Sequence, residues 1–254
     1  MYEYTDIRIS IMRKQIKEFL YPPLYDLGKY YYFRFFKGSF FAKDQLDKKL
    51  KKYINYENGY FIELGANNGF SQSNTLYFEI KRNWRGILVE PCPNLYVQCC
   101  YFRNRERNFI FCNACVGFDY TEKYVDINYG NLMTTSESLV LDIPDGSNFY
   151  EKRDKNTSID EKSLKFGSLA CTLDTIMAKS NAPKKIDLLS IDVEGAELSV
   201  LSGVNYKKYQ FKYIVVETRA PAKVIKFLAE RSYRFEECLS KHDLLFSHFA
   251  EDQP

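Results

Sequence analysis

The chain has 254 residues, which is enough to bury one sizeable hydrophobic core, and its formal net charge of +3 at pH 7 is small. So small a charge gives no reason to expect a nucleic-acid partner. No run approaches the roughly 18 apolar residues that span a bilayer, and charged residues interrupt the first positions, where a signal peptide would be apolar. The seven cysteines are an odd number, so we expect reduced thiols. Together these features predict a cytoplasmic protein with no transmembrane segment.

Residues 1–43 are an aromatic-rich N-terminal extension. Their apolar spacing predicts one helix that ends at a Pro-Pro pair and a second helix over 24–36, which together would form a helical layer. This composition fits packing on the main domain, pairing of two copies in a homodimer, or peripheral contact with a membrane. Acidic residues interrupt any basic stripe, so the first two alternatives are favoured over the membrane.

Residues 44–254 are predicted to form the main domain, which opens with a lysine-rich helix capped by Asp44. Strands and helices then alternate, with helices expected to start at Ser71, Pro93 and Thr172. The seven strands are expected at 60–64, 86–90, 108–116, 186–192, 211–217, 234–239 and 243–249. This repeated unit predicts an α/β fold with a doubly wound, mostly parallel seven-stranded sheet.

Residues 128–168 are polar, lack clear periodicity and are too long for a simple connection. We expect an inserted, lid-like segment that covers an acceptor, and the alternative is a surface loop. Its neutral polar groups and aromatic ring suit a sugar, and we name Tyr129 and Asn131 as acceptor contacts.

Four of the predicted parallel strands end in an acidic residue. These residues are Glu63, Glu90, Asp192 and Glu217. Acids are depleted in strands, so packing alone does not explain the repetition. Because ligands of open α/β sheets bind at the carboxyl ends of the strands, the four acids indicate a functional site there.

The first strand leads into a glycine-spaced turn, and its sequence restricts the ligand. Glu90 lies 21 residues after Gly69, the spacing at which a carboxylate binds ribose hydroxyls. The turn reads G-x-N-x-G, which lacks the spacing of the dinucleotide fingerprint. Glu63 stands just before it and would repel a pyrophosphate. An amino group or a sulfonium would suit Glu63, and S-adenosylmethionine carries both.

Two further motifs accompany the turn, W-R-G-I-L-V-E-P over 84–91 and I-D-L-L-S-I-D-V-E-G-A-E over 186–197. With them, from about residue 44 to residue 218, the chain closely resembles the FkbM family of S-adenosylmethionine-dependent O-methyltransferases. The resemblance implies the class I methyltransferase fold, which is Rossmann-like. It also implies an enzyme, since family members of known activity mostly methylate hydroxyl groups of sugars or polyketides.

The resemblance further implies where the cofactor binds. The residues expected around its methionine part are Glu63, Gly65, Ala66, Asn67, Gly69 and Ser71. Glu90 would hold the ribose, and Asn113 and Ala114 would flank the adenine. Asp192 would lie beside the transferring methyl group. Asn68 stands where the family commonly has an acid.

Methylation of a hydroxyl group needs a base or a metal ion, because a sugar hydroxyl is a poor nucleophile at neutral pH. Asp192 is the leading catalytic candidate, with Glu217 beside it, and two such carboxylates can bind Mg²⁺ or another divalent cation. Glu194 and Arg219 are expected to contact the acceptor. The alternative for Asp192 and Glu194 is capping of the following helix, and His242 is a second candidate base.

The sequence therefore predicts an S-adenosylmethionine-dependent O-methyltransferase acting on a hydroxyl group, specifically of a carbohydrate in a surface glycan. One alternative is a nicotinamide-dependent oxidoreductase of a sugar nucleotide. Another is a methyltransferase fold that binds a partner without catalysis.

Overall fold

The computed structural model describes residues 40–130, 133–136 and 164–249, together with Gly28, Tyr31 and Phe35. At 129, 130, 133–136 and 164 it describes the backbone alone. The chain divides into two compact units, Met1–Phe40 and Phe41–Pro254, and the second contains every element discussed below. The predictions for the N-terminal extension and for Asn131 fall outside the described residues, as does the side chain of Tyr129.

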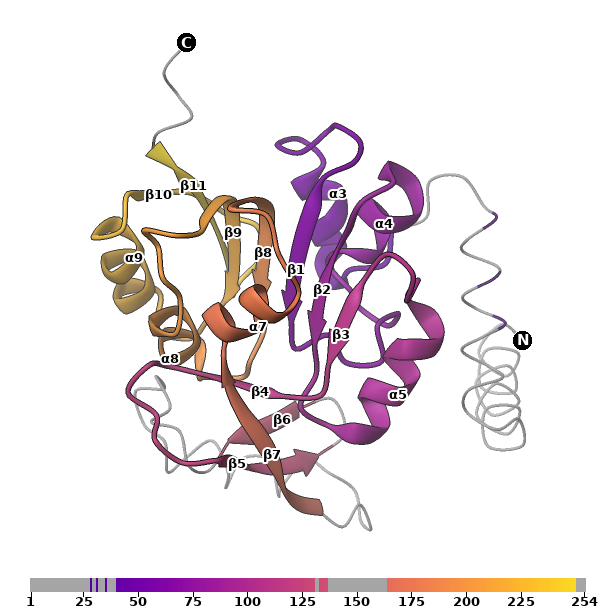
Figure 1. Cartoon of the computed structure of the whole chain (residues 1–254). Coiled ribbons are helices and arrows are strands. Elements are labelled where there is room, and N and C mark those ends of the chain that lie inside the picture. Colours follow the sequence, from indigo (N-terminus) through magenta and orange to yellow (C-terminus); the bar gives the residue numbers. More distant parts are fainter. Residues whose placement is uncertain are drawn as a thin grey trace, which may run out of the picture. The chain divides into compact units, whose positions relative to one another are not determined.

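A seven-stranded sheet runs through the second unit (Figure 1). Its order is β10 (Tyr233–Cys238), β11 (Asp243–His248), β9 (Gln210–Glu217), β8 (Lys185–Ile191), β1 (Tyr60–Leu64), β2 (Arg85–Val89) and β3 (Phe109–Phe111). In this sheet β11 runs opposite to the other six strands, which are parallel to one another. The strand order reverses between β1 and β8, which is where open sheets of this kind bind ligands. The predicted doubly wound, mostly parallel sheet is confirmed.

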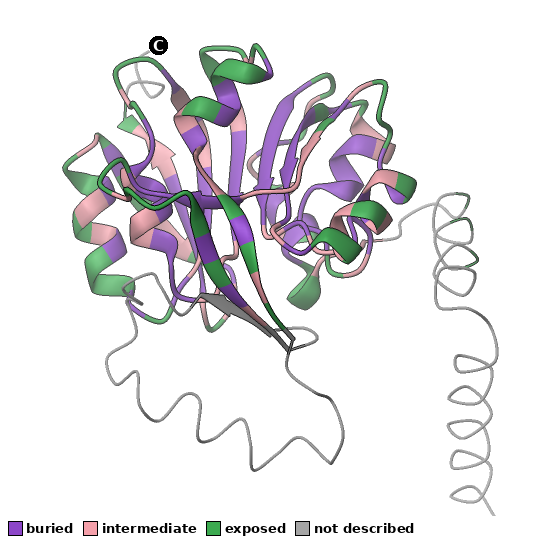
Figure 2. Cartoon of the chain, turned by 60° about the horizontal axis from the view of Figure 1, so that its bottom comes forward, coloured by how far each residue is buried: buried purple, intermediate pink, exposed green. Residues whose placement is uncertain are grey.

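Helices cover both faces of this sheet. The helices of one layer are α3 (Leu46–Leu50), α4 (Leu76–Arg82) and α5 (Pro93–Phe102), and those of the other are α7 (Leu173–Lys179), α8 (Glu197–Ser202) and α9 (Pro221–Ala229). Apolar residues of α7, α8 and α9 pack with Ile62 and Ile87 in one cluster. Because side chains alternate along a strand, the neighbouring Phe61 faces the other layer, where Arg103 lies over its ring. Figure 2 shows the strands buried and the outer helix faces exposed.

A second, four-stranded sheet contains β4 (Ala114–Val116), β7 (Leu164–Thr172), β5 (Tyr124–Gly130) and β6 (Met133–Ser136), in that order. The single strand predicted over 108–116 is therefore wrong. The chain leaves the main sheet after Phe111 and pairs through β4 with β7 instead. The described ends of the predicted segment 128–168 are strands, because β5 continues to Gly130 and β7 begins at Leu164.

Two predicted helix starts are also wrong. Asp44 lies with positive φ inside a 3-10 helix (Lys43–Gln45), and α3 begins at Leu46. The buried Asp47 instead accepts hydrogen bonds from the backbone N–H groups of Phe41 and Ala42. The helix expected from Ser71 begins at Leu76, because Gln72 has positive φ. The Thr172 cap is confirmed, since its hydroxyl accepts from the Thr175 N–H.

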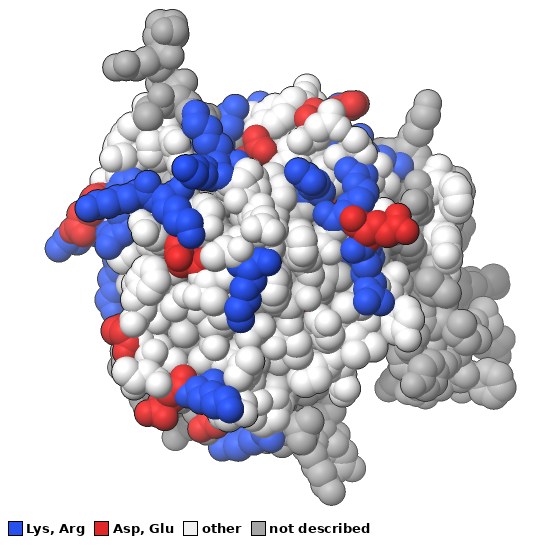
Figure 3. Space-filling view, in the orientation of Figure 1, with Lys and Arg blue, Asp and Glu red and all other residues white. Residues whose placement is uncertain are grey.

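The surface of this unit is mixed in charge. On the face seen in Figure 1, basic side chains stand in separate groups divided by uncharged surface (Figure 3). None of the helices in the described part of the chain is long and apolar enough to cross a membrane.

Gly86 provides a test of the β1–β2 packing. A Cβ atom added to Gly86 would lie 2.0 Å from the carbonyl oxygen of Phe61, whereas one added to Gly167 on β7 would meet nothing nearer than 3.5 Å. We expect Gly86→Ala to lower the free energy of unfolding by about 3 kcal/mol, the upper range for overpacking. The control, Gly167→Ala, should change it by less than about 1 kcal/mol. Equal denaturant midpoints for the two variants would contradict this packing.

Candidate functional site

A crevice lies where the carboxyl ends of β1, β2 and β8 meet, and it consists of two adjoining hollows. Four residues line both of them: Leu64, Gly65, Asn67 and Asp192. The first hollow is further lined by Val89, Glu90, Pro91, Leu95, Asn113, Ala114, Cys115, Val125, Ile127, Val193, Glu194 and Ala196. The second is further lined by Glu63, Ala66, Ser71, Gln72, Ser73, Asn74 and Ser190. With the solvent at its mouth, the first encloses about 770 Å³ of empty space.

The turn after β1 fits the crevice only because glycine stands at its start. Gly65 has φ +77°, and a Cβ atom there would lie 1.9 Å from the carbonyl oxygen of Asp192. The N–H groups of Gly65 and Ala66 donate to the carbonyl of Val89, and the N–H of Asp192 donates to that of Leu64. The ends of three strands are thereby fixed against one another.

Glu90 ties the end of β2 to this turn. One carboxylate oxygen accepts from the backbone N–H of Asn67 at 2.8 Å, and the other accepts from that of Cys92 at 2.9 Å. Burial raises the pKa of Glu90 to about 7. Each oxygen keeps a further lone pair, so a carboxylate in this position can also accept hydrogen bonds from a pair of ligand hydroxyls.

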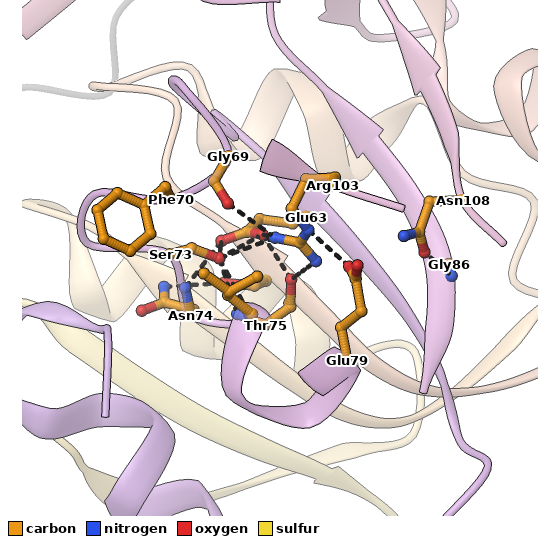
Figure 4. Close-up of polar contacts among 12 residues, drawn as sticks. Glu63, Gly69, Phe70, Ser73, Asn74, Thr75, Glu79, Gly86, Arg103 and Asn108 are labelled. Atoms are coloured by element: carbon orange, nitrogen blue, oxygen red, sulfur yellow. Dashed lines mark hydrogen bonds and ion pairs between the residues drawn. The ribbon is translucent and has the colours of Figure 1, made fainter. Parts of the chain in front are cut away.

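Glu63 holds the far end of the turn (Figure 4). Its carboxylate accepts hydrogen bonds from the Ser73 hydroxyl at 3.0 Å and from the backbone N–H of Asn74 at 2.8 Å. The Thr75 hydroxyl donates to it at 2.6 Å. Glu63 is therefore largely engaged by protein groups, although it still borders the second hollow.

Arg103, directly after α5, neutralises this buried acid. Its guanidinium forms ion pairs with Glu63 at 3.2 Å and with Glu79 at 2.6 Å. It also donates to the carbonyl of Gly69 and to the hydroxyls of Ser73 and Thr75. Sequence reasoning missed Arg103. The available signal was that an acid within an apolar strand needs a buried cation, but the chain offers 36 Lys and Arg residues as candidates.

Asp192 and Glu217 form a carboxyl pair at the ends of the neighbouring strands β8 and β9, close enough for the charge of one to act on the other. Burial raises the pKa of Asp192 well above its ordinary value, and the charges of Glu217 and Glu194 raise it further. Asp243 stands opposite Glu217 on β11, and its pKa is also raised, mainly by burial. The neighbouring negative charges thus oppose ionisation of Asp192.

The described structure brings together most of the residues predicted for the site. The predicted residues that line one or both hollows are Glu63, Gly65, Ala66, Asn67, Ser71, Glu90, Asn113, Ala114, Asp192 and Glu194. Gly69 instead faces α5, since a Cβ atom there would lie 2.7 Å from the Cys99 sulfur. Arg219 is exposed just after β9. Val125 and Ile127, which were not predicted, supply an apolar wall from the second sheet.

Asn68 and Glu197 both hold backbone N–H groups near the site. The Asn68 side chain accepts from the N–H groups of Phe70 and Ser71, so it shapes the turn from a buried position. Glu197 accepts from the N–H of Gly195 at the start of α8, where no capping side chain is found at Ala196.

The residues present do not form a site for a divalent cation. Within the described ranges, no three His, Cys, Asp or Glu side chains are arranged to hold a metal ion. Mg²⁺ therefore has no part in the reaction proposed below.

Comparison with known proteins identifies the family. A family model described as the methyltransferase FkbM domain matches residues 63–235. The chain belongs to the FkbM methyltransferase family. The family resemblance noted from the three motifs is thereby confirmed, and so is the class I fold. No curated protein matches the chain.

The chain is also similar to several solved structures at low sequence identity. They include a methyltransferase FkbM from Methylobacillus flagellatus KT, at 13% identity and TM-score 0.42 over 75% of this chain and 44% of that one. A precorrin-6y C5,15-methyltransferase from Geobacter metallireducens GS-15 shows 12% identity and TM-score 0.40 over 83% and 93% of the two chains. TrmK of M. capricolum, in complex with S-adenosyl-homocysteine, shows 9% identity and TM-score 0.37 over 79% and 65%. The present chain thus spans less than half of the first of these proteins.

The raised pKa of Glu90 makes stability depend on pH. Its pKa is about 7 in the folded protein against 4.5 ordinarily, so the ionised carboxylate destabilises the fold, and this destabilisation disappears as pH falls through 7 toward 4.5. Glu90→Gln removes the titration. We expect its free energy of unfolding, relative to wild type, to be higher at pH 8 than at pH 5 by on the order of 2 kcal/mol. If urea titrations gave the same difference in free energy of unfolding between Glu90→Gln and wild type at both pH values, the raised pKa of Glu90 would be disproved.

Proposed function

We propose that the protein transfers the methyl group of S-adenosylmethionine to a hydroxyl group of an acceptor, and that this acceptor is a sugar in a surface glycan. The observation that carries the proposal is the crevice itself. It places Glu90, which suits a ribose, one strand away from the turn, and it has Asp192, the neighbour of Glu217, at its other side. Membership of the FkbM family supports both the cofactor and the reaction class.

The two hollows divide the cofactor between them in this proposal. Glu90 would accept hydrogen bonds from the ribose hydroxyls in the first hollow. Asn113 and Ala114 would flank the adenine there, against the apolar wall of Val125 and Ile127. The methionine part would occupy the second hollow, which is polar and is lined by side chains of the turn: Asn67, Ser71, Ser73 and Asn74. When bound, the cofactor supplies an activated methyl group on a sulfonium.

The carboxyl pair would remove the proton of the acceptor hydroxyl. As the acceptor oxygen bonds to the methyl carbon, the carbon–sulfur bond breaks with its electrons left on sulfur, and the hydroxyl proton passes to Asp192. Burial and the charges of Glu217 and Glu194 raise the pKa of Asp192. A raised pKa suits a general base, since catalysis is best when the pKa lies near the working pH.

The acceptor is proposed to be a neutral sugar. Glu194, which lines the first hollow, and the exposed Arg219 would contact it. Tyr129, at the end of β5, and Asn131 beyond it belong to the segment that we expect to cover the acceptor. Family members that methylate sugars or polyketides share this chemistry of a hydroxyl nucleophile.

The direct experiment is transfer of a labelled methyl group from S-adenosylmethionine to a panel of sugars and whole surface glycans, with and without a chelator. We expect label on a carbohydrate oxygen, unaffected by the chelator. Cofactor binding by calorimetry without transfer to any hydroxyl acceptor would favour the non-catalytic alternative. Binding of NAD(P) instead would favour the oxidoreductase.

Asp192→Asn tests the role of the carboxyl pair. The substitution keeps the size of the side chain and removes its basicity, so methyl transfer should slow by roughly 10²-fold or more, as expected for loss of a general base. The affinity for S-adenosylhomocysteine should stay within a few-fold of wild type. The control is Glu230→Gln, a change at a side chain that is 59% exposed, and it should leave the rate unchanged. Near-wild-type turnover by Asp192→Asn would refute the role.

A further inference from the structure

We propose that Arg103 is a positioning residue for the amino-acid half of the cofactor: it fixes the wall of the second hollow without touching the ligand. The proposal rests on the assignment of the methionine part to that hollow. Arg103 is buried, with 3% of its surface exposed, and is not among the residues that line either hollow. Arg103 therefore acts on the ligand only through the groups that it binds.

Those groups belong to the segment that makes the wall. Arg103 Nη1 donates to the carbonyl oxygen of Gly69 at 3.3 Å and to the hydroxyl of Ser73 at 3.0 Å. Its Nη2 donates to the hydroxyl of Thr75 at 2.9 Å. These contacts fall at both ends of the lining residues Ser71 to Asn74. Figure 4 shows the carbonyl of Gly69 and the hydroxyls of Ser73 and Thr75 directed toward the guanidinium of Arg103.

Glu63 closes the arrangement from the strand side. The same carboxylate that pairs with Arg103 also accepts from Ser73, from Thr75 and from the backbone of Asn74. Without the guanidinium, this buried carboxylate would lose its positive partner and would draw in water or rotate away. The polar wall of the second hollow would then move with it.

The geometry requires a guanidinium rather than any cation. Arg103 uses all three nitrogens at once: Nε donates to Glu79, Nη1 to Glu63 and to the turn, and Nη2 to the hydroxyl of Thr75. The planar fork of arginine provides five donors in fixed directions, whereas lysine provides a single flexible ammonium. Lysine at this position could satisfy one of the two acids but could not span α4, β1 and the turn together.

The nucleoside half is held by other contacts. Glu90 is positioned by the backbone of Asn67 and Cys92, and the apolar wall comes from β5. None of these contacts that the structure describes involves Arg103. Loss of Arg103 should therefore weaken binding of the amino-acid half selectively.

The experiment compares two ligands by calorimetry. S-adenosylhomocysteine carries the amino-acid part, and 5′-methylthioadenosine keeps the nucleoside and sulfur but lacks that part. For Arg103→Lys we expect the affinity for S-adenosylhomocysteine to fall at least 10-fold and that for methylthioadenosine to fall less than 3-fold. Thr75→Val, which removes one hydroxyl near the wall and keeps the volume, should give a smaller loss of the same selectivity. This second variant provides the test should Arg103→Lys not fold.

Glu79→Gln is the matched control. Its amide oxygen can still accept from Arg103 Nε, but the buried ion pair is lost, so the melting temperature should fall while the ratio of the two affinities stays within twofold of wild type. Equal losses for both ligands in Arg103→Lys and in Thr75→Val, or a changed ratio in Glu79→Gln as large as in Arg103→Lys, would overturn the positioning role. If wild-type protein binds neither ligand, the proposed function fails first. If it binds both and the ratio never changes, only this inference fails.

Discussion

The crevice depends on one buried guanidinium held between two buried carboxylates. An isolated charge in a protein interior is strongly unfavourable, and removing one member of a buried pair costs about 3–5 kcal/mol because its partner stays behind. Arg103, Glu63 and Glu79 avoid that cost only while the surrounding hydroxyls and carbonyls satisfy their remaining donors and acceptors. The requirement for those contacts fixes the backbone from Gly69 to Thr75 in one conformation, and this backbone forms one side of the site.

Close backbone contacts connect this turn to the carboxyl pair. Gly65 passes so near to the carbonyl oxygen of Asp192 that no side chain fits on Gly65. The backbone N–H of Asp192 in turn donates to the carbonyl of Leu64. A displacement of the turn would therefore move the end of β8, and with it the proposed base. Glu90 adds a third connection, from β2. The parts that would hold the cofactor and the part that would accept the proton are thus built on the same three strand ends.

Much of the main sheet could be predicted because its signals are local. Buried parallel strands appear as short apolar runs, and the acids that end them stand out against that background. The Thr172 cap could be recognised from the hydroxyl residue directly before an apolar helix. The same locality explains why Glu90 could be predicted to belong to the site at the strand ends from its distance along the chain.

The errors arose where distant segments decide the structure. Residues 108–116 read as one strand, yet the break at Cys112 and Asn113 exists because β7, more than 50 residues later, pairs with β4. The start of α4 was misplaced because Ser73 and Thr75 are engaged by Glu63, which leaves Ser71 in the turn. Arg103 and the wall formed by Val125 and Ile127 also depend on tertiary packing, which single-residue patterns do not encode.

A crystal structure of the protein with S-adenosylhomocysteine would test the central claim most directly. We expect the ribose on Glu90, the homocysteine amino-acid group against Ser71 to Asn74, and the Arg103 contacts to Glu63, Gly69 and Thr75 unchanged from those of the free protein. A ligand bound outside the two hollows, or a turn that rearranges and releases Arg103 on binding, would contradict a crevice preformed by the buried charges.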